Sequence, residues 1–239
     1  NRGVALFGDN VYTATLDARV VALDAESGEV VWDTPVADNA SGYYMTLAPL
    51  AARGKIMVGV SGGELGIRGF VVALDAETGE EVWRTYTVPG PGEPGNDSWP
   101  GDSWRTGGAA VWITGHYDPD LGLTYWGTGN PGPWIGDQRP GDNLYTNSVI
   151  ALAVDTGELV THHQYHWNGS WDWDEVSTPL LIDVERDGRT IPSLVHPGRN
   201  GYLWILEREA EAIKFVAAQP FVRQNVFASL DPETGRPTY

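Results

Sequence analysis

The amino-acid sequence predicts an all-β protein assembled from repeated antiparallel hairpins, and three features support this. A segment that closes on a tryptophan occurs at residues 22–32 and again at residues 73–83. The chain contains 30 Gly and 11 Trp, a composition that suits β-strands joined by tight turns. It shows no long pattern of an amphipathic helix.

Each copy of the repeat has the same physical design. A short apolar strand such as Arg19–Leu23 leads into a turn of the form Asp-x-x-Ser/Thr-Gly. The Asp side chain of such a turn can accept hydrogen bonds from backbone amides, and the Gly can adopt a positive φ. A second strand then ends in a tryptophan, Trp32 or Trp83, which we expect to act as an anchor. Weaker copies follow at residues 151–158 and 229–235.

The spacing of the repeats predicts a β-propeller of four-stranded antiparallel blades. The first two copies are 51 residues apart, from residue 22 to residue 73. One blade takes about 40 to 50 residues, so residues 1–239 are expected to form about four blades of a single domain. Further strands are expected at Lys55–Val60, Leu123–Gly127, Thr178–Asp183 and Tyr202–Leu206. Residues 207–215 are expected to form one or two helical turns, and residues 89–97 a loop over one face.

Charge and composition exclude several classes of protein. The formal net charge of −17 argues against nucleic-acid binding, which needs a cationic surface. No apolar run approaches the roughly 20 residues that span a bilayer. The absence of Cys removes disulfides and thiolate metal sites from this chain. Because the sequence opens at Asn1 without a Met, we expect an internal piece of a longer protein, and the missing signal peptide then says nothing about secretion.

Three turns carry side chains that could bind a cation. They are Ser61–Gly69 with Glu64, Gly127–Trp134 with Asn130, and Trp171–Asp174 with Asp172 and Asp174. Carboxylate and amide oxygens suit a hard cation such as Ca²⁺, and glycines let the backbone approach a ligand closely. In an extended segment Asp172 and Asp174 point to one side and the two neighbouring tryptophans to the other. These residues alone do not establish a metal site. Such turns are common in β proteins, and an Asp-x-Asp pair more often lies on a solvated surface than binds a metal ion.

A cluster of histidines raises the alternative of a zinc site. His162, His163 and His166 lie close together in the sequence. Two of them are adjacent and no Cys is near, so the pattern disfavours zinc.

A series of motifs runs in order along nearly the whole sequence. It comprises Asn1–Gly3, Thr46–Pro49, Ser61–Gly69, Trp104–Gly108, Tyr117–Pro119, Gly127–Trp134, Arg139–Asn143, Trp171–Asp174, Arg199–Tyr202 and Ser229–Pro232. Together these motifs resemble the large subunit of methanol and ethanol dehydrogenases that depend on pyrroloquinoline quinone (PQQ). The resemblance implies an eight-bladed propeller in the full-length protein, with the tryptophan turns as docking motifs between blades.

The resemblance also implies roles for individual residues. The residues that would hold PQQ are Arg2, Thr46, Ser61, Gly62, Gly63, Trp112 and Arg199, with Trp112 as the floor under the quinone ring. The metal ligands would be Glu64, Asn130, Asp172 and Asp174. The catalytic residues would be Asp172, as the base, and Arg199, beside the reactive quinone oxygens. Asp174 matches an additional carboxylate of the lanthanide-dependent branch, which favours La³⁺ or Ce³⁺ over Ca²⁺.

The activity that the resemblance implies is periplasmic oxidation of a small primary alcohol, such as methanol, to the aldehyde. PQQ would accept the hydride, a c-type cytochrome would take the electrons, and a homodimer is a compatible assembly. The metal ion would act as a Lewis acid on a quinone carbonyl. Two alternatives stay open. One is a non-catalytic propeller scaffold of the outer-membrane assembly type, and the other is a PQQ-dependent sugar or polyol dehydrogenase.

The sequence departs from the family pattern around the catalytic segment. Ala110 stands where the family usually has a Thr that contacts PQQ. Asn168 and Gly169 replace a common His-Asp pair, and Glu175 and Ser177 replace a common Gly and Asn. The changes at residues 168–177 surround the catalytic segment.

Overall fold

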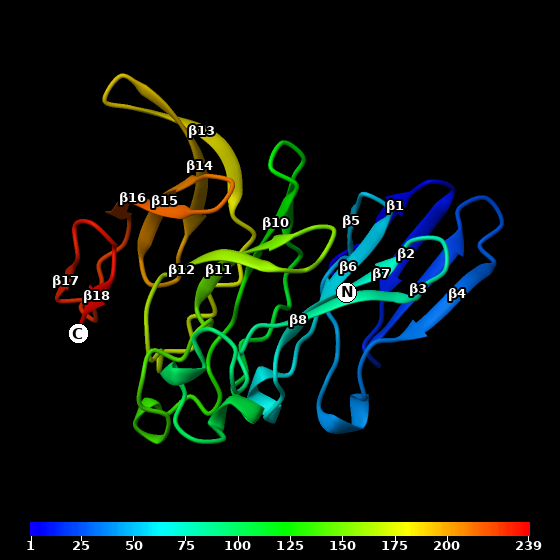
Figure 1. The fold of residues 1–239 in the computed structure, drawn as a ribbon, viewed down its shortest axis with the longest axis horizontal. Coiled ribbons are helices and arrows are strands. Elements are labelled where there is room, and N and C mark those ends of the chain that lie inside the picture. The colour runs from blue at the N-terminus through cyan, green and yellow to red at the C-terminus, as the bar shows by residue number, and fades with distance from the viewer.

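The computed structural model describes residues 1–239 and consists of β-strands, short 3-10 helices and loops. Four antiparallel sheets of four sequential strands follow one another along the chain, and a two-stranded sheet comes last (Figure 1). The first two sheets are β1 (Ala5–Phe7), β2 (Asn10–Ala14), β3 (Arg19–Asp24), β4 (Val30–Pro35) and β5 (Leu50–Ala52), β6 (Lys55–Gly59), β7 (Phe70–Asp75), β8 (Glu81–Tyr86). The next two are β9 (His116–Asp118), β10 (Leu123–Gly127), β11 (Ser148–Ala153), β12 (Leu159–Gln164) and β13 (Leu180–Arg186), β14 (Arg189–Pro197), β15 (Tyr202–Arg208), β16 (Ile213–Pro220). The remaining elements are β17 (Ser229–Leu230), β18 (Pro237–Thr238) and the 3-10 helices η1 (Asn39–Ser41), η2 (Gly63–Leu65), η3 (Asn96–Ser98), η4 (Ser103–Thr106) and η5 (Gly136–Gln138).

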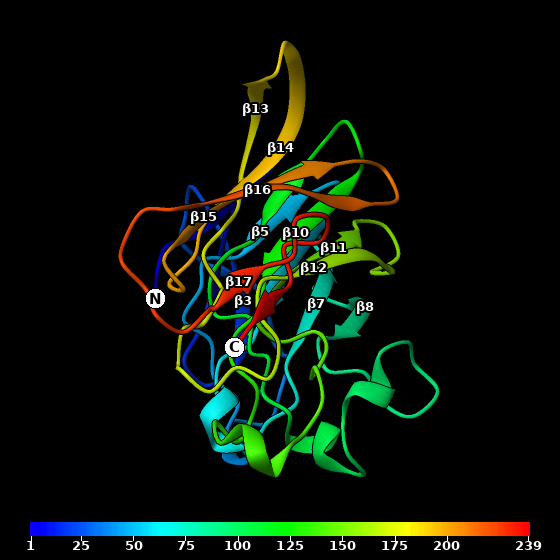
Figure 2. The same cartoon turned by 90° about the vertical axis from the view of Figure 1, so that its left-hand side faces the viewer.

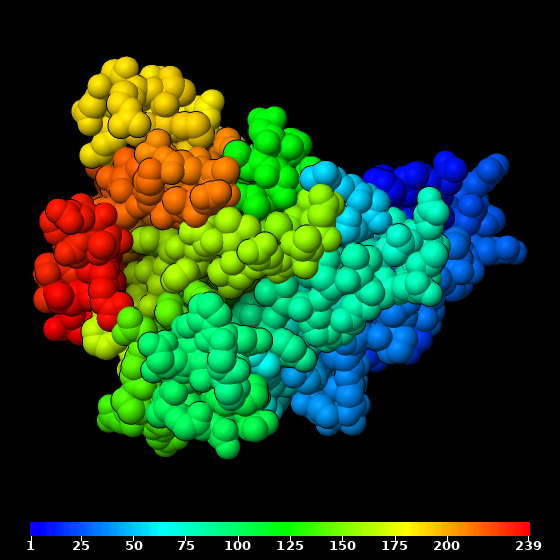
Figure 3. Space-filling view, viewed as in Figure 1, coloured from blue at the N-terminus to red at the C-terminus, as the bar shows by residue number.

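The four sheets stand side by side in chain order, from the blue N-terminal sheet to the orange fourth sheet in Figure 1. The first strands of neighbouring sheets contact one another: β1 with β5, β5 with β9, and β9 with β13. The hairpin of β13 and β14 projects beyond the other strands (Figure 2). On the face drawn in Figure 3 the side chains of successive sheets are in close contact. Antiparallel four-stranded sheets with adjacent first strands are blades of a β-propeller, and the predicted fold class is confirmed.

Tryptophan anchors join successive blades. Trp32 on β4 donates from Nε1 to the backbone oxygen of Ala76 in the second blade, at 3.1 Å. Trp83 on β8 donates in the same way to Val154 in the third blade, at 3.0 Å. The predicted anchor role is therefore confirmed. The strands themselves do not end at the tryptophans as expected, because the pairing of β3 with β4 continues as far as Pro35.

The Asp of the repeated turn holds the turn closed. Asp24, Asp75 and Asp231 each accept hydrogen bonds from the backbone N–H groups two and three residues later. These bonds and those from the neighbouring hydroxyls hold the pKa of all three carboxyls below the usual value. The hydroxyl of Ser27 has the largest effect on Asp24. The third copy has Ala153 at this position and forms its turn without a carboxylate.

Gly157 lies in the turn of the third blade on which Trp83 packs, and it provides a test of this anchor. Gly157 has a φ of +72°, and a Cβ built on it would lie 2.5 Å from the ring of Trp83. We expect Gly157→Ala to lower the free energy of unfolding by about 2–4 kcal/mol, since it adds an overpacked contact to the left-handed strain. Gly54→Ala is the matched control, because Gly54 has a φ of +74° with nothing within 4 Å. For Gly54→Ala the free energy of unfolding should fall by only about 1–2 kcal/mol. Equal losses in urea unfolding of the two full-length variants would contradict the docking role.

Residues 207–215 do not form the expected helical turns. They comprise the end of β15, a tight turn closed by the bond from Glu209 N–H to Ala212 O, and the start of β16. β15 pairs with β14 on one edge and with β16 on the other. Pairing on both edges therefore outweighs the helix propensity of the Glu and Ala residues. The four other expected strands are present as β6, β10, β13 and β15.

Candidate active site

The predicted site residues lie on loops that leave the blades at one end. Connections from the fourth strand of one blade to the first strand of the next carry Thr46, Trp112, Asp172 and Asp174. Turns between the second and third strands carry Ser61, Gly62, Gly63, Glu64, Asn130 and Arg199. In a sheet of sequential antiparallel strands these two kinds of connection lie at the same end of the strands. The repeated turns between the third and fourth strands lie at the opposite end. Residues far apart in the sequence therefore meet at one end of the blades.

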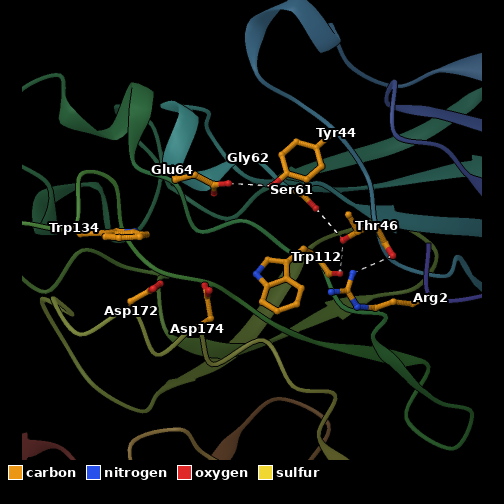
Figure 4. A pocket seen from close by; sticks show the side chains of 10 residues that line it. All are labelled: Arg2, Tyr44, Thr46, Ser61, Gly62, Glu64, Trp112, Trp134, Asp172 and Asp174. Atoms are coloured by element: carbon orange, nitrogen blue, oxygen red, sulfur yellow. Dashed lines mark hydrogen bonds between the residues drawn. The ribbon is translucent and has the colours of Figure 1, made fainter.

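Most of these residues line one open cavity of about 380 Å³ (Figure 4). Its lining consists of Arg2, Tyr44, Thr46, Ser61, Gly62, Glu64, Trp112, Trp134, Asp172 and Asp174. A smaller cavity of about 40 Å³ shares several of these residues and adds Gly63, Ala110 and Asn130. The larger volume falls in the range of small-molecule sites, about 300–1,000 Å³.

The cavity separates its charges. Glu64, Asp172 and Asp174 lie to one side of Trp112, and Arg2 lies to the other (Figure 4). The guanidinium of Arg2 lies 4.8 Å from the ring centroid of Trp112. One side is therefore suited to a cation and the other to an organic anion with a flat ring.

Asn130 joins the two aspartates. Its Nδ2 donates to Asp172 Oδ1 at 2.8 Å and its backbone N–H donates to Asp174 Oδ1 at 3.0 Å. Its Oδ1 accepts from the backbone N–H of Asp174 at 3.2 Å. Three hydrogen bonds thus tie the turn after β10 to the connection between the third and fourth blades.

The Asp172–Asp174 segment is not extended, which corrects the expectation from its alternating pattern. Asp172 and Asp174 have φ values of +56° and +48°, in the left-handed region. Both still line the cavity, while Trp171 and Trp173 stack on each other with their centroids 5.1 Å apart. Asp adopts this conformation more readily than most residues, and the bonds to Asn130 compensate its strain.

The side of the cavity with Arg2 has a hydroxyl lining. Arg2 Nη1 donates to the backbone oxygen of Thr46 at 3.1 Å. The hydroxyls of Thr46 and Ser61 lie 3.3 Å apart, and the Thr46 hydroxyl also donates to the backbone oxygen of Trp112 at 3.3 Å. A cation, two hydroxyls and an indole face therefore surround the same space, a set of groups that matches a planar polycarboxylate such as PQQ.

Charge crowding marks the acidic side. Burial is the largest influence on the Asp174 carboxyl and raises its pKa. The hydrogen bond from the Asn130 N–H lowers this pKa, and the negative charge of Asp172 raises it. Burial also raises the pKa of Tyr44, whose hydroxyl donates to Glu64 Oε1 at 3.0 Å. Because no cationic side chain is bonded to these carboxylates, a bound hard cation would relieve their repulsion. The all-oxygen donor set fits Ca²⁺ or a lanthanide ion.

The carboxylates do not converge on a common point in the structure. No group of three or more His, Asp or Glu side chains is arranged to hold a metal ion. Asp172 and Asp174 are bonded to Asn130, and Glu64 to Tyr44. Binding a cation would therefore require some of these bonds to be exchanged for metal contacts.

Arg199 lies at the edge of the site. It is exposed on the turn between β14 and β15 and does not line the cavity. Its positive charge nevertheless lowers the pKa of Asp174, as the weakest of the influences on that carboxyl. The structure therefore brings Arg199 near the acidic side without placing it in the lining.

Two lining residues were missed in the sequence. Tyr44 lies two positions before Thr46 and holds Glu64. Trp134 closes the glycine-rich turn that carries Asn130, and it is 47% exposed. No sequence signal separates Trp134 from a core residue, since Trp99 also follows a glycine-rich loop and is buried.

A buried arginine connects two walls of the site. Arg139 is fully buried and donates to the backbone oxygens of Pro133, Trp134 and Gly169 and to Asn143 Oδ1. Burial lowers its pKa to about 10, so the guanidinium stays protonated at neutral pH. Arg139 thereby holds the Trp134 loop against the chain that leads to Asp172.

The three histidines of the predicted cluster face different neighbours. The ring of His162 packs edge-on against Tyr145, and His163 lies among Tyr165, Trp204 and Phe215. His166 packs edge-on against the two stacked tryptophans, Trp171 and Trp173. Burial lowers the pKa of His163 to about 3 and the pKa values of His162 and His166 to about 4.

These buried imidazoles predict a pH dependence of stability. Between pH 6.5 and about 3 the unfolded chain takes up a proton that buried His163 does not, so the free energy of unfolding falls as the pH falls. Each such histidine contributes up to about 1.4 kcal/mol per pH unit within its window. We expect His163→Phe, which suits the aromatic surroundings, to reduce this slope in urea unfolding of the full-length protein between pH 7 and pH 5. An unchanged slope would show that His163 is not buried in its neutral form.

The chain is similar to known proteins in sequence and in structure. Residues 33–226 match the family model described as the glucose/ethanol/alcohol dehydrogenase β-propeller domain, PQQ. The chain is 40% identical to the quinoprotein alcohol dehydrogenase PedH of Pseudomonas putida, covering 100% of this chain and 42% of that protein. It is 38% identical to the lanthanide-dependent methanol dehydrogenase of Methylacidiphilum fumariolicum, covering 99% and 42%. Among solved structures it superposes on a europium-containing methanol dehydrogenase with a TM-score of 0.93 and 38% identity, covering 99% of this chain and 44% of the other. The chain thus spans about two fifths of the length of these relatives.

Proposed function

The chain belongs to the β-propeller family of PQQ-dependent glucose, ethanol and alcohol dehydrogenases, and from this premise we propose that its protein oxidises a small primary alcohol with PQQ as cofactor. The observation that carries the proposal is the cavity itself. It combines Arg2, two hydroxyls and the face of Trp112 on one side with three carboxylates on the other. A scaffold that uses the tryptophan anchors alone has no need of this arrangement.

Individual residues of the cavity have distinct tasks in this proposal. Arg2, Thr46 and Ser61, with the backbone of Gly62 and Gly63, would bind the cofactor's carboxylates and carbonyls, and Trp112 would support its ring. PQQ supplies the hydride acceptor that amino-acid side chains lack. Asp172, which is exposed to the cavity, takes the proton from the alcohol hydroxyl. Arg199, at the edge of the site, would contribute positive charge that stabilises the negative charge developing during the reaction.

The metal ion of the proposal is a lanthanide, with Ca²⁺ as the alternative. Glu64, Asn130, Asp172 and Asp174 would be its ligands. The crowding of Asp172 against Asp174 supports this, because a trivalent ion compensates one more carboxylate than a divalent ion does. The bound ion would polarise a carbonyl of the cofactor as a Lewis acid.

We also propose a setting for the reaction on the basis of the family. None of the helices in the structure is long or apolar enough to cross a bilayer. We place the protein in the periplasm, with residues 1–239 as part of one eight-bladed propeller domain and a c-type cytochrome as the electron acceptor. The relatives include a methanol dehydrogenase whose name specifies cytochrome c, from Methylorubrum extorquens.

The experiment that tests the function is a dye-linked assay of the full-length protein. The apoprotein is supplied with PQQ and La³⁺ or Ca²⁺ and offered methanol, ethanol, glucose and glycerol. We expect dye reduction with the primary alcohols only when PQQ and a metal are both present. Turnover with glucose or glycerol alone would indicate a sugar or polyol dehydrogenase in place of an alcohol dehydrogenase. Absence of PQQ-dependent turnover with every substrate would favour the scaffold.

A further inference from the structure

A buried carboxylate lies directly behind the aspartates of the cavity. Glu175 follows Asp174 in the chain and is 1% exposed. Its Oε1 accepts a hydrogen bond from Asn200 Nδ2 at 2.8 Å, and its Oε2 lies 2.7 Å from His196 Nε2. His166 Nε2 is 3.6 Å from the same carboxylate. Glu175 does not line the cavity, so these contacts serve something other than direct binding.

The partners of Glu175 flank Arg199. His196 lies near the end of β14, and Asn200 lies in the turn that leads to β15. Asn200 is held in turn, because its Oδ1 accepts from the backbone N–H of Tyr202 and from Trp204 Nε1, both at 3.1 Å. The Glu175 carboxylate is therefore bonded to a rigid part of the fourth blade on both sides of the Arg199 position.

The segment that carries Asp172 and Asp174 is held by side-chain contacts rather than by strand pairing. Residues 171–177 belong to no strand, and two of them adopt left-handed backbone conformations. Backbone pairing cannot set their position, so side-chain contacts must. Asn130 holds the segment toward the cavity, the stacked tryptophans pack on His166, and Glu175 adds hydrogen bonds to the fourth blade from behind. A buried carboxylate is costly unless its hydrogen bonds are made, so Glu175 depends on the positions of both partners.

We propose that Glu175 is a positioning residue that fixes the Asp172–Asp174 segment relative to Arg199. The inference rests on the proposed function, since it treats these three residues as parts of one catalytic site. Glu175 acts through the length and hydrogen-bonding atoms of its side chain. It touches neither the substrate nor the cofactor.

Three substitutions in the full-length protein separate length from charge. Glu175→Gln keeps the length and an oxygen that accepts from Asn200, while Glu175→Asp keeps the charge but withdraws it by one methylene. Glu175→Ala removes the link. We expect kcat per PQQ-bound site to fall by roughly 10–100-fold in the Ala and Asp variants, because small misplacements of catalytic groups cost about this much. The Gln variant should stay within about fivefold of the wild type, with KM for the alcohol little changed throughout.

The matched control is another buried carboxylate that links the same two blades. Asp118 on β9 pairs with Arg208 on β15, is 2% exposed and does not line the cavity. Asp118→Ala should lower Tm but leave kcat per PQQ-bound site within about twofold. A merely structural role for Glu175 predicts the same outcome for Glu175→Ala.

The outcomes distinguish this proposal from the proposed function. If Glu175→Ala fails to fold, the comparison of Asp with Gln still decides, and a higher kcat for Asp than for Gln overturns the positioning role. A wild-type kcat in Glu175→Ala, or an equal loss in Asp118→Ala, also overturns it while leaving the alcohol dehydrogenase intact. A wild-type protein that binds PQQ and oxidises no alcohol overturns both.

Discussion

Asp172→Asn in the full-length protein is expected to lower kcat for alcohol oxidation by about 10²–10⁴-fold, the usual contribution of a general base. The substitution keeps the oxygen that accepts from Asn130 Nδ2, so the segment should hold its shape. Of the two aspartates, Asp172 is the exposed one, and its carboxylate accepts a side-chain hydrogen bond where Asp174 accepts one from the backbone. The substitution therefore removes the carboxylate that is better placed to take a proton. At a saturating concentration of the metal ion, PQQ binding, measured by quenching of tryptophan fluorescence, should remain within a few fold of the wild type.

The control for this prediction is Asp187→Asn. Asp187 lies at the tip of the β13–β14 hairpin with its side chain 90% exposed, and its φ of +50° is one that Asn also tolerates. Wild-type turnover is expected. If Asp172→Asn turned over as fast as this control, Asp172 would not be the base.

Asp174→Asn is expected to change which metal ion the protein prefers. The substitution preserves an oxygen for the Asn130 N–H but removes the charge that crowds Asp172. We expect the affinity for La³⁺ to fall by roughly 100-fold or more and the affinity for Ca²⁺ to fall much less, because a trivalent ion depends more on ligand charge.

Titration of both ions into the apoprotein with PQQ measures the preference. The dissociation constant for La³⁺ divided by that for Ca²⁺ should rise in Asp174→Asn. The same ratio should stay unchanged in Asp187→Asn. A parallel loss of both affinities would mean that Asp174 is a ligand without being the determinant of metal choice.

The fold could be predicted from the sequence because its rule is local and repeated. A strand, a turn of fixed composition and a tryptophan recur together, and the side chain that docks is part of the repeated segment itself. The error at residues 207–215 arose where local propensity and pairing disagree. Glu and Ala favour helix there, but β14 and β16 supply pairing partners that no local window reveals.

The candidate site was predictable only in part, since its residues converge from separate loops. The resemblance supplied eight of the ten residues that line the cavity, all except Tyr44 and Trp134. The left-handed backbone of Asp172 and Asp174 could not be foreseen, because it depends on bonds to Asn130. The supporting contacts of Arg139 and Glu175 were invisible for the same reason. Each joins segments that are distant in the sequence, and neither residue touches the cavity.

The measurement that tests the central claim most directly is a fluorescence titration of PQQ into the full-length apoprotein, with La³⁺, with Ca²⁺ and with a chelator. Trp112 lines the cavity beside Arg2, so a bound quinone should quench it. We predict saturable quenching that requires a metal ion, is tighter with La³⁺ and is much reduced in Trp112→Phe. Absence of saturable binding with either ion, or quenching that is unchanged in Trp112→Phe, would contradict the assignment of this cavity to PQQ.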